Sequence, residues 1–462
     1  MGLLGRRAIP MALKRLKETV DASGKTGSDT DSESSGLSEK LFKKHSDVAE
    51  KAFKTLGELK GVALKMGQML SYMDGAIPQE YQAVYQDVLT RLQSEAPSLP
   101  WESVRPILEA ELGDIETRFA SIEETPFAAA SIGQVHRAVL PDGTLVAVKV
   151  QYPGVDKAMA SDLKNAALFQ TMMSPALSMM GAKKATKSYM KEVMSEIQAR
   201  LMEELDYERE ARMQMRFRAL LADDPDVVVP EVFAEWSTGK VLTSALIDAK
   251  PLSHVVEHAD QETRDKYATT LTRAMLTLMH RHHLFNADPH PGNYLFFEDG
   301  RVCLLDFGCV KEIPDWMHTE MTAYLKAGVR ASQTEDPDDW AAFDRALGKA
   351  LRLDGAEPAM VAYFREFSLY IMRPALTEGP FDFTTAYARE SFDRVMEGTR
   401  ETVFGKGKMP RVPKIPEVPA DYTFLNRLQW GFYSILTMLK ARVDWRAQYP
   451  AEMWSAEAEQ WP

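Results

Sequence analysis

Three short motifs lie far apart in the sequence but in a definite order, and this order constrains the fold more than any other feature. Lys149 lies in the alternating pattern "LVAVKVQY", typical of a strand whose lysine faces one side while its neighbours fill a core. "NADPHPGNYLF" holds Asp288 and Asn293 around a stiff, sharply turned loop, and Asp306 ends the apolar run in "LLDFG". Each motif alone has an ordinary explanation, as a solvated lysine, a turn or a helix cap. Together they predict that the three segments meet at one site.

The residue types in these motifs suit phosphoryl transfer. The carboxylate of Asp288 can orient a nucleophile, and the amide oxygen of Asn293 can ligate a metal ion. Asp306 suits a metal-binding carboxylate at a sheet edge. Hard oxygen ligands without a thiolate or histidine cage indicate Mg²⁺ with ATP or ADP. The ordered set of lysine strand, D-x-x-x-x-N and D-F-G resembles that of the protein kinases.

The segments around the motifs predict helices first and then a small sheet. Helical periodicity covers residues 46–92, and "SLPWESVRPILEAELG" predicts a helix that begins near Ser98 or Pro100 and ends before Gly113. "RFASIEETPFA", "GQVHRAVL" and "LVAVKVQY" predict strands, and a Pro-Asp-Gly turn joins the last two. A loop that lies against phosphates usually contains glycines, but this one has alanines. We expect Ala128, Ala129 and Ala130 to favour a local helical turn whose N–H groups face an anion.

The remainder of the chain is mostly helical. A long helical stretch is expected from Val155 to Leu220, followed by strands in "DVVVPEVFAEW" and "KVLTSALI". After Pro251 the pattern is helical apart from one strand-turn-strand island, "NYLFFEDGRVCLLDFG". The expected fold is α+β, a protein-kinase-like two-lobed fold with a helical insertion in the N-lobe and a helical C-terminal region. We divide the chain into a basic helix and linker (1–44), a helical extension (45–113), an N-lobe (114–250) and a helical C-lobe with its extension (251–462).

Charge and cysteine content exclude some classes of protein. The net charge of −12 argues against a general nucleic-acid binder. The two cysteines provide no disulfide framework, which favours a reducing, cytoplasmic location. "MPRVPKIPEVPADY" spaces prolines every third residue and favours polyproline II, either as a strap across the protein's own surface or as a ligand for a proline-reading module.

No segment predicts a membrane span or a signal peptide. The longest uncharged run, residues 165–182, is polar enough to favour a helical hairpin broken at Pro175. Residues 1–20 form a basic amphipathic pattern. It suits either an ordinary packed helix or peripheral contact with the inner surface of a membrane.

Five segments together resemble the ABC1/ADCK/UbiB family of atypical kinases, which is linked to ubiquinone and isoprenoid-lipid biosynthesis. These are "KMGQ", "AAASIGQVH", "EELDYEREA", "ADPHPGN" and "LLDFG", and the resemblance covers roughly residues 45–330. It implies that Lys149 contacts phosphates and that Glu210 is its ion-pair partner on the C-helix. It also implies kinase-like roles for the motif residues Asp288, Asn293 and Asp306.

The resemblance assigns roles to two further groups of residues. Lys65 and Gln68 match the KxGQ motif, on a helix that folds over the active site, and Glu204 and Asp206 match the family's ExD pair. From the residues alone, Lys65 lies on an apolar helical face and needs an acidic partner, for which these two carboxylates are candidates.

The nucleotide pocket implied by the resemblance is formed by the alanine loop and the hinge. The loop of Ala128, Ala129 and Ala130 with Ser131 would alter nucleotide preference, and Ala245 would contact adenine through its main chain. Two departures from kinase patterns stand out. Ser244 and Ala245 replace the Met-Glu that is common in the family's hinge. Asn286 and Ala287 precede Asp288 where protein kinases have His-Arg, so regulation through a phosphorylated activation loop is not expected.

The expected activity is that of an atypical kinase acting as an ATPase, rather than as a protein kinase, in support of ubiquinone or isoprenoid-lipid biosynthesis. The implied partners are nucleotide, a quinone precursor or lipid, and proteins of a biosynthetic complex. Two alternatives remain open at this point. One is a conventional phosphotransferase acting on a protein or a small hydroxyl substrate, and the other is a nucleotide-binding scaffold without turnover.

Overall fold

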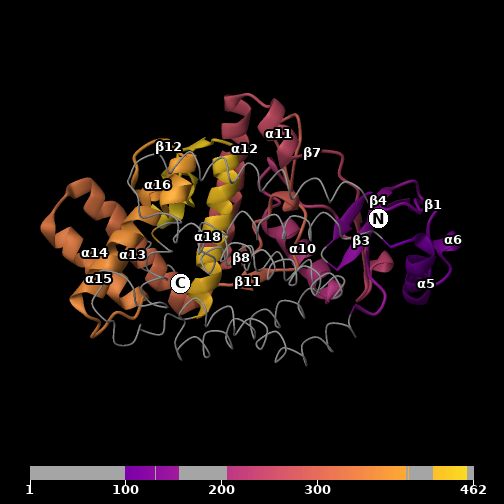
Figure 1. Ribbon diagram of the computed structural model, residues 1–462, viewed down its shortest axis with the longest axis horizontal. Coiled ribbons are helices and arrows are strands. Elements are labelled where there is room, and N and C mark those ends of the chain that lie inside the picture. Colours follow the sequence, from indigo (N-terminus) through magenta and orange to yellow (C-terminus); the bar gives the residue numbers. More distant parts are fainter. Residues whose placement is uncertain (1–98, 131, 156–204, 392–393, 395–419, 455–462) are drawn as a thin grey trace, which may run out of the picture.

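The computed structural model describes residues 99–130, 132–155, 205–391, 394 and 420–454 (Figure 1). A small sheet lies at one end of the molecule, and a larger group of helices lies at the other. This is the α+β, kinase-like arrangement expected from the sequence. In the part of the chain that the structure describes, no helix combines the length and apolar character needed to cross a membrane.

The N-lobe sheet is antiparallel and carries the lysine strand at its centre. Its strands follow the order β1-β3-β4-β6, and β2 pairs with β3. In the β3–β4 hairpin Val135 pairs with Lys149, and in the β4–β6 pair Lys149 faces Leu242. The strands are β1 (Ser121–Ile122), β2 (Ala128–Ala130), β3 (Gly133–Val139), β4 (Leu145–Gln151) and β6 (Val241–Ala245).

Two helices cover one face of this sheet. α5 (Trp101–Leu112) begins after Pro100 and ends at Gly113, whose φ of 83° suits a residue without a β-carbon. α6 (Ile115–Arg118) follows, with the side chain of Asp114 capping its first turn. Val104 and Leu108 of α5 pack with Val148 of β4 in a common core. The helix boundaries expected from "SLPWESVRPILEAELG" are therefore confirmed.

The C-helix, α10 (Tyr207–Leu220), lies beside the sheet and begins at the N-cap Asp206. It confirms the C-terminal end of the long helical stretch, whose residues 156–204 lie outside the described part of the chain. "DVVVPEVFAEW" forms the short strand β5 (Val227–Val228), an isolated bridge from Val232 to Ser244 and the 3-10 turn η2 (Ala234–Trp236), so the strand expected there is shorter than predicted. Pro225 and Pro230, which lack an N–H to donate, bound the paired segment.

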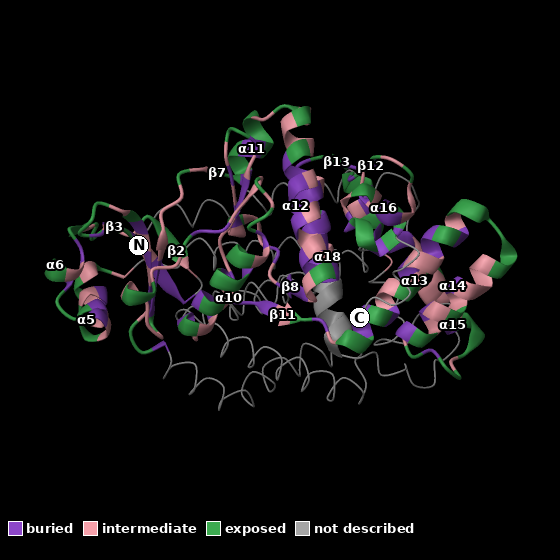
Figure 2. Ribbon diagram, turned by 180° about the vertical axis from the view of Figure 1, so that it is seen from behind, coloured by how far each residue is buried: buried purple, intermediate pink, exposed green. Residues whose placement is uncertain are grey.

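The C-lobe is a set of helices around one large apolar core. α12 (Gln261–His282) runs through its centre, and Figure 2 shows buried residues along much of its length. α18 (Ala420–Met438) lies alongside α12 in Figures 1 and 2. Further helices of the C-lobe include α11 (Leu252–His258), α13 (Asp315–Thr334), α14 (Pro337–Ala350), α15 (Pro358–Ile371) and α16 (Arg373–Leu376), followed near the C-terminus by the 3-10 turns η4 (Arg446–Gln448) and η5 (Ala451–Trp454).

Three small sheets complete the C-lobe. One has the order β5-β10-β9-β7, another pairs β8 with β11, and the third pairs β12 with β13. The β9–β10 pair confirms the strand-turn-strand island. The strands are β7 (Lys250–Pro251), β8 (Leu284–Asn286), β9 (Tyr294–Phe296), β10 (Val302–Leu304), β11 (Val310–Glu312), β12 (Phe381–Asp382) and β13 (Arg442–Val443).

The prediction of a helical turn in the alanine loop is wrong. Ala128, Ala129 and Ala130 form the extended strand β2, in which Ala130 pairs with Gly133 of β3. Pairing with β3 satisfies the backbone groups of the loop and outweighs the helical preference of alanine, which is weak for so short a segment. Gly133 lets the strands approach closely, because a β-carbon there would lie 2.2 Å from the carbonyl oxygen of Val150.

Candidate active site

Lys149 and Glu210 form an ion pair between β4 and α10. The Nζ atom of Lys149 lies 2.7 Å from Oε1 and 2.9 Å from Oε2 of Glu210. The Glu210 side chain is only 4% exposed, and Lys149 is 18% exposed. Lys149 Nζ also lies 4.9 Å from the centre of the Tyr207 ring. The ammonium group is thus held in one place by a short, largely desolvated contact.

The electrostatics of this pair keep Lys149 charged. Burial alone would lower the pKa of Lys149, but the charge of Glu210, together with Tyr207 and Asp306, more than offsets it. The pKa of Lys149 therefore lies above its ordinary value. A lysine that stays charged near Asp306 is suited to neutralising phosphate oxygens.

The loop from Asp288 to Asn293 is held by its own hydrogen bonds. His290 N–H donates to the carbonyl oxygen of Asp288 at 2.8 Å, and Asn293 N–H donates to that of His290 at 2.9 Å. The side chain of Asn293 donates from Nδ2 to the Asp288 carbonyl at 2.9 Å. The 3-10 turn η3 (Pro291–Asn293) closes the loop. Because the amide nitrogen of Asn293 is used in this way, its oxygen is the atom suited to a metal ion.

Asn286 joins this loop to the segment of Asp306. Its Oδ1 accepts the Asp288 N–H at 3.0 Å, while its Nδ2 donates to the carbonyl oxygen of Asp306 at 2.6 Å. The sequence marked Asn286 only as a departure from protein kinases. The signal that could have identified its role was its place two residues before Asp288, where an Asn side chain often bonds the backbone two residues on.

The segment after Asp306 is clamped to the C-helix by Arg209. The guanidinium of Arg209 donates to the carbonyl oxygens of Gly308 and Val310, both at 2.9 Å. The Gly308 N–H in turn donates to Oδ1 of Asp306 at 2.9 Å. Arg209 precedes Glu210, so adjacent residues of α10 hold the Asp306 segment and Lys149. Sequence reasoning missed Arg209, although it lies inside the motif "EELDYEREA".

Other predicted site residues have different surroundings. Asp206 caps α10, accepting the N–H of Arg209 at 2.8 Å. Ala245 ends β6, and its N–H donates to the carbonyl oxygen of Glu231 at 2.8 Å, so that amide is already engaged. Ala128 and Ala129 are exposed, and Ala130 is partly exposed. The predicted residues Lys65, Gln68, Ser131 and Glu204 lie outside the described part of the chain.

A small apolar cavity of about 40 Å³ lies directly behind the candidate metal ligands. Asn286, Asn293 and Asp306 form its polar wall. Apolar residues of α10, α12, α18 and the strands β8, β9 and β10 line the rest of it, with Leu428 and Phe432 supplied by α18. Asn293 and Asp306, from two of the segments that the sequence predicted to meet, therefore do meet at this cavity.

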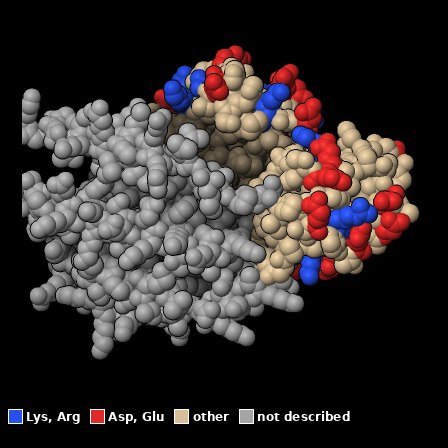
Figure 3. Space-filling model, turned by 45° about the vertical axis from the view of Figure 1, so that its right-hand side comes forward, with Lys and Arg blue, Asp and Glu red and all other residues tan. Residues whose placement is uncertain are grey.

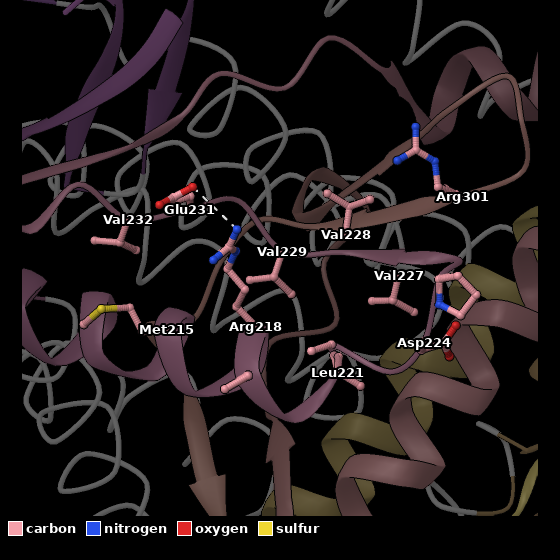
Figure 4. Close-up of a pocket in the computed structure, with 13 residues that line it drawn as sticks. Met215, Arg218, Leu221, Asp224, Val227, Val228, Val229, Glu231, Val232 and Arg301 are labelled. Atoms are coloured by element: carbon pink, nitrogen blue, oxygen red, sulfur yellow. Dashed lines mark hydrogen bonds and ion pairs between the residues drawn. The ribbon is translucent and has the colours of Figure 1, made fainter. Parts of the chain in front are cut away.

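A larger groove of about 660 Å³ lies on another face of α10 (Figure 4). Met215, Arg218 and Ala222 line one wall, and the valines of β5 line the other. Arg218 and Glu231 form an ion pair of 3.5 Å across it. None of the predicted site residues lines this groove, so it is separate from the candidate active site.

The donor set fits a hard divalent cation shared with phosphates. Among the described residues there is no cluster of three or more His, Cys, Asp or Glu side chains able to hold a metal by themselves. Mg²⁺ usually takes only one or two protein ligands, with water and phosphate completing its shell. Asn293 and Asp306 provide such a pair.

In Figure 3 the described surface has a hollow whose visible walls are mainly uncharged, with acidic and basic side chains around it.

Comparisons with known proteins find a matching family and related proteins. Residues 91–335, more than half of the chain, match the ABC1 atypical kinase-like domain. The chain is 32% identical to "Atypical kinase COQ8B, mitochondrial" of Danio rerio over 409 residues, 87% of this chain and 60% of that protein. It is 35% identical to "Atypical kinase COQ8, mitochondrial" of Saccharomyces cerevisiae over 256 residues, 54% of this chain and 48% of that protein. The chain thus spans about half to three fifths of these relatives.

A solved structure is similar over nearly the whole chain. It is the complex of Rv3197 with erythromycin from Mycobacterium tuberculosis, with a TM-score of 0.59 and 30% sequence identity. The similarity covers 91% of this chain and 97% of that one.

Proposed function

We propose a function on one premise: the chain belongs to the ABC1 atypical kinase-like family. On this basis it binds Mg-ATP or ADP between its lobes and transfers the terminal phosphoryl group of ATP, chiefly to water. The observation that carries the proposal is the short Lys149–Glu210 ion pair, on the same site as Asp306. A desolvated ion pair beside a carboxylate that is suited to a metal ion is typical of functional sites.

The chain's own residues have separate roles in this proposal. Lys149, positioned by Glu210, neutralises phosphate oxygens, and Asn293 and Asp306 hold Mg²⁺. Asp288 orients the attacking water or hydroxyl and accepts its proton. Bound Mg-ATP supplies the transferable phosphoryl group. Asn286 and Arg209 keep the two loops in place through the hydrogen bonds described above.

The biological role we propose is support of ubiquinone or isoprenoid-lipid biosynthesis, with a quinone precursor or lipid as effector and proteins of a biosynthetic complex as partners. Support comes from family membership and from the similarity to the two COQ8-type atypical kinases. We also propose a cytoplasmic location with peripheral contact at the inner membrane surface.

Phosphate release from ATP tests the proposal directly. We expect turnover by the purified chain, stimulated by anionic liposomes and a quinone-headgroup phenol. Asp306→Asn removes one of the two metal ligands and should reduce turnover by roughly 100-fold or more, because the metal carries much of the charge stabilisation. Turnover by Asp306→Asn equal to that of the unaltered chain would contradict the site assignment.

The same assay separates the alternatives. Transfer of radiolabel from ATP to a protein or small hydroxyl acceptor, without release of phosphate, would favour the conventional phosphotransferase. Nucleotide binding without turnover, even with liposomes and phenol present, would favour the scaffold.

A further inference from the structure

α18 lies outside the segment that matches the family domain, yet it contacts the loop from Asp288 to Asn293, which we call the catalytic loop. A β-carbon on Gly431 would lie 2.3 Å from Cγ, 3.2 Å from Cβ and 3.3 Å from the carbonyl oxygen of Pro289. Pro289 directly follows Asp288, and its ring is tied to the backbone and cannot swing aside. Any side chain at residue 431 must therefore move the loop or the helix.

Residues on the same face of α18 extend this contact. Leu428, three residues before Gly431, packs with Phe285 and Ala287, which lead into the loop. Phe432 and Leu428 also wall the cavity behind Asn293 and Asp306. Positions three and four apart lie on one face of a helix, so a single seam of α18 supports both loops of the site.

α18 is also anchored to the C-lobe helices, so it cannot simply retreat. Gln429 Nε2 and Tyr433 Oη donate to the carbonyl oxygen of Ile371 at 3.2 and 3.0 Å. Ile371 is the last residue of α15. Phe432 and Tyr433 are buried in the large C-lobe core. The C-lobe helices thus hold α18 in a position where it packs against the catalytic loop.

We propose that α18 sets the position of the catalytic loop, with Gly431 as the positioning residue that lets the helix approach Pro289. The proposal rests on the function proposed above, since it assigns how Asp288 and Asn293 are aligned for phosphoryl transfer. A displacement of about 1 Å at a reacting group can cost on the order of 100-fold in rate.

Gly431→Ala is the direct test. We expect kcat for ATP hydrolysis to fall by roughly tenfold or more. The Kd of Mg-nucleotide should rise by a smaller factor, because Asn293 moves with the loop while Lys149 and Glu210, on β4 and α10, still bind the phosphates. Leu428→Ala, which loosens the seam without a clash, should lower kcat in the same direction and less strongly. Unchanged kcat in both variants would overturn the proposal.

Two glycines in other helices provide matched controls. A β-carbon on Gly348 of α14 would meet nothing within 4 Å, so Gly348→Ala should leave kcat and Tm nearly unchanged. A β-carbon on Gly328 of α13 would lie 2.9 Å from Met372 Cε and 3.2 Å from the Phe343 ring. Gly328→Ala should lower Tm but should not reduce kcat as Gly431→Ala does. If Gly328→Ala lowers kcat as much as Gly431→Ala does, loss of packing alone explains the result and the positioning role fails.

A double variant tests the contact itself. Pro289→Ala removes the ring carbon that the added methyl group of Gly431→Ala would strike. The two substitutions combined should therefore give a higher kcat than Gly431→Ala alone. The absence of any rescue would contradict the assigned contact.

Hydrogen exchange gives a readout independent of activity. We expect faster amide exchange over residues 284–293 in Gly431→Ala than in the unaltered chain, and no such change in Gly348→Ala. If the unaltered chain does not hydrolyse ATP, the proposed function fails while the exchange still tests the contact. Unchanged exchange over this segment would overturn the positioning role whatever the activity.

Discussion

Asn286 takes part in both loops of the site through one side chain. Its oxygen accepts the Asp288 N–H and its nitrogen donates to the Asp306 carbonyl oxygen, so one side chain links the two loops. Arg209 makes the equivalent link from the C-helix to the segment after Asp306. At the residue scale, the Asn286 amide and the Arg209 guanidinium therefore align the two loops through hydrogen bonds to their backbones. The arginine that would read a phosphorylated loop in protein kinases is absent before Asp288.

Glu210 provides the sharpest test at the residue scale. Glu210→Gln keeps the size of the side chain but removes the charge that holds Lys149. We expect the free energy of unfolding to fall by roughly 1–3 kcal/mol, since a desolvated ammonium loses its main partner. Nucleotide affinity should fall as well. Urea unfolding and nucleotide titration measure the two effects.

Glu208→Gln is the matched control for Glu210→Gln. Glu208 lies on the same helix, is 63% exposed, and lies 3.8 Å from Arg212. Exposed pairs of this kind contribute little to stability. Equal losses in the two variants would contradict a special role for Glu210.

Among the elements, the β3–β4 hairpin shows how one glycine fixes a register. Gly133 faces Gln151, and the missing β-carbon leaves room for the Val150 carbonyl oxygen. The alanine strand β2 pairs onto the same hairpin, so its position depends on this close approach. β2 is the element that the sequence placed against phosphates.

Gly133→Ala is predicted to separate β3 from β4 locally. Because the obstructing atoms are backbone atoms of Val150, 2.2 and 2.9 Å away, the strands themselves must shift. We expect a loss of about 1–3 kcal/mol in the free energy of unfolding. Gly239→Ala, where nothing lies within 4 Å, should be nearly neutral. Denaturant unfolding of both variants checks the prediction, and an equal effect at the two positions would contradict it.

At the scale of the whole molecule, a group of histidines ties α12 to α13 in the C-lobe. His283 stacks on His318 with ring centres 3.9 Å apart, and His280 lies 5.7 Å from His318. Burial, with the neighbouring histidines, lowers the pKa of His280 to about 3 and that of His318 to about 4. Both residues are therefore neutral in the folded protein near neutral pH.

This group predicts a loss of stability in mild acid. The ordinary pKa is 6.5, so between pH 6.5 and about 4 the unfolded chain binds protons that folded His280 and His318 do not. The free energy of unfolding should therefore fall as pH drops through this window, by at most about 1.4 kcal/mol per pH unit for each histidine. His318→Phe should flatten the pH dependence of the free energy of unfolding, measured by urea unfolding between about pH 7 and 5. His254→Phe, which changes an exposed residue of α11, should leave this pH dependence unaltered. An unchanged slope in His318→Phe would contradict the prediction.

The order of elements could be predicted because it depends on local patterns, and the meeting of the motif residues could be predicted because their order resembles that of the protein kinases. Alternation around Lys149, turn residues around Asp288 and the Pro100–Gly113 helix signals each require only a few neighbouring residues. The alanine loop could not be predicted in the same way, because strand pairing decided its conformation. "DVVVPEVFAEW" was predicted as strand, but Pro225 and Pro230 limit its pairing with β10 to two residues, and Val232 adds only an isolated bridge to Ser244.

The sequence by itself determined the class of the chain: the family resemblance, the kinase-like order of motifs and the identity of Lys149, Asp288, Asn293 and Asp306 as candidate site residues. Only the tertiary structure decided what holds them in place. Asn286, Arg209 and Gly431 act through backbone groups that are distant in sequence or contacted from another element. No spacing rule encodes such contacts, because a carbonyl oxygen carries no residue identity and the need for glycine depends on what lies opposite it.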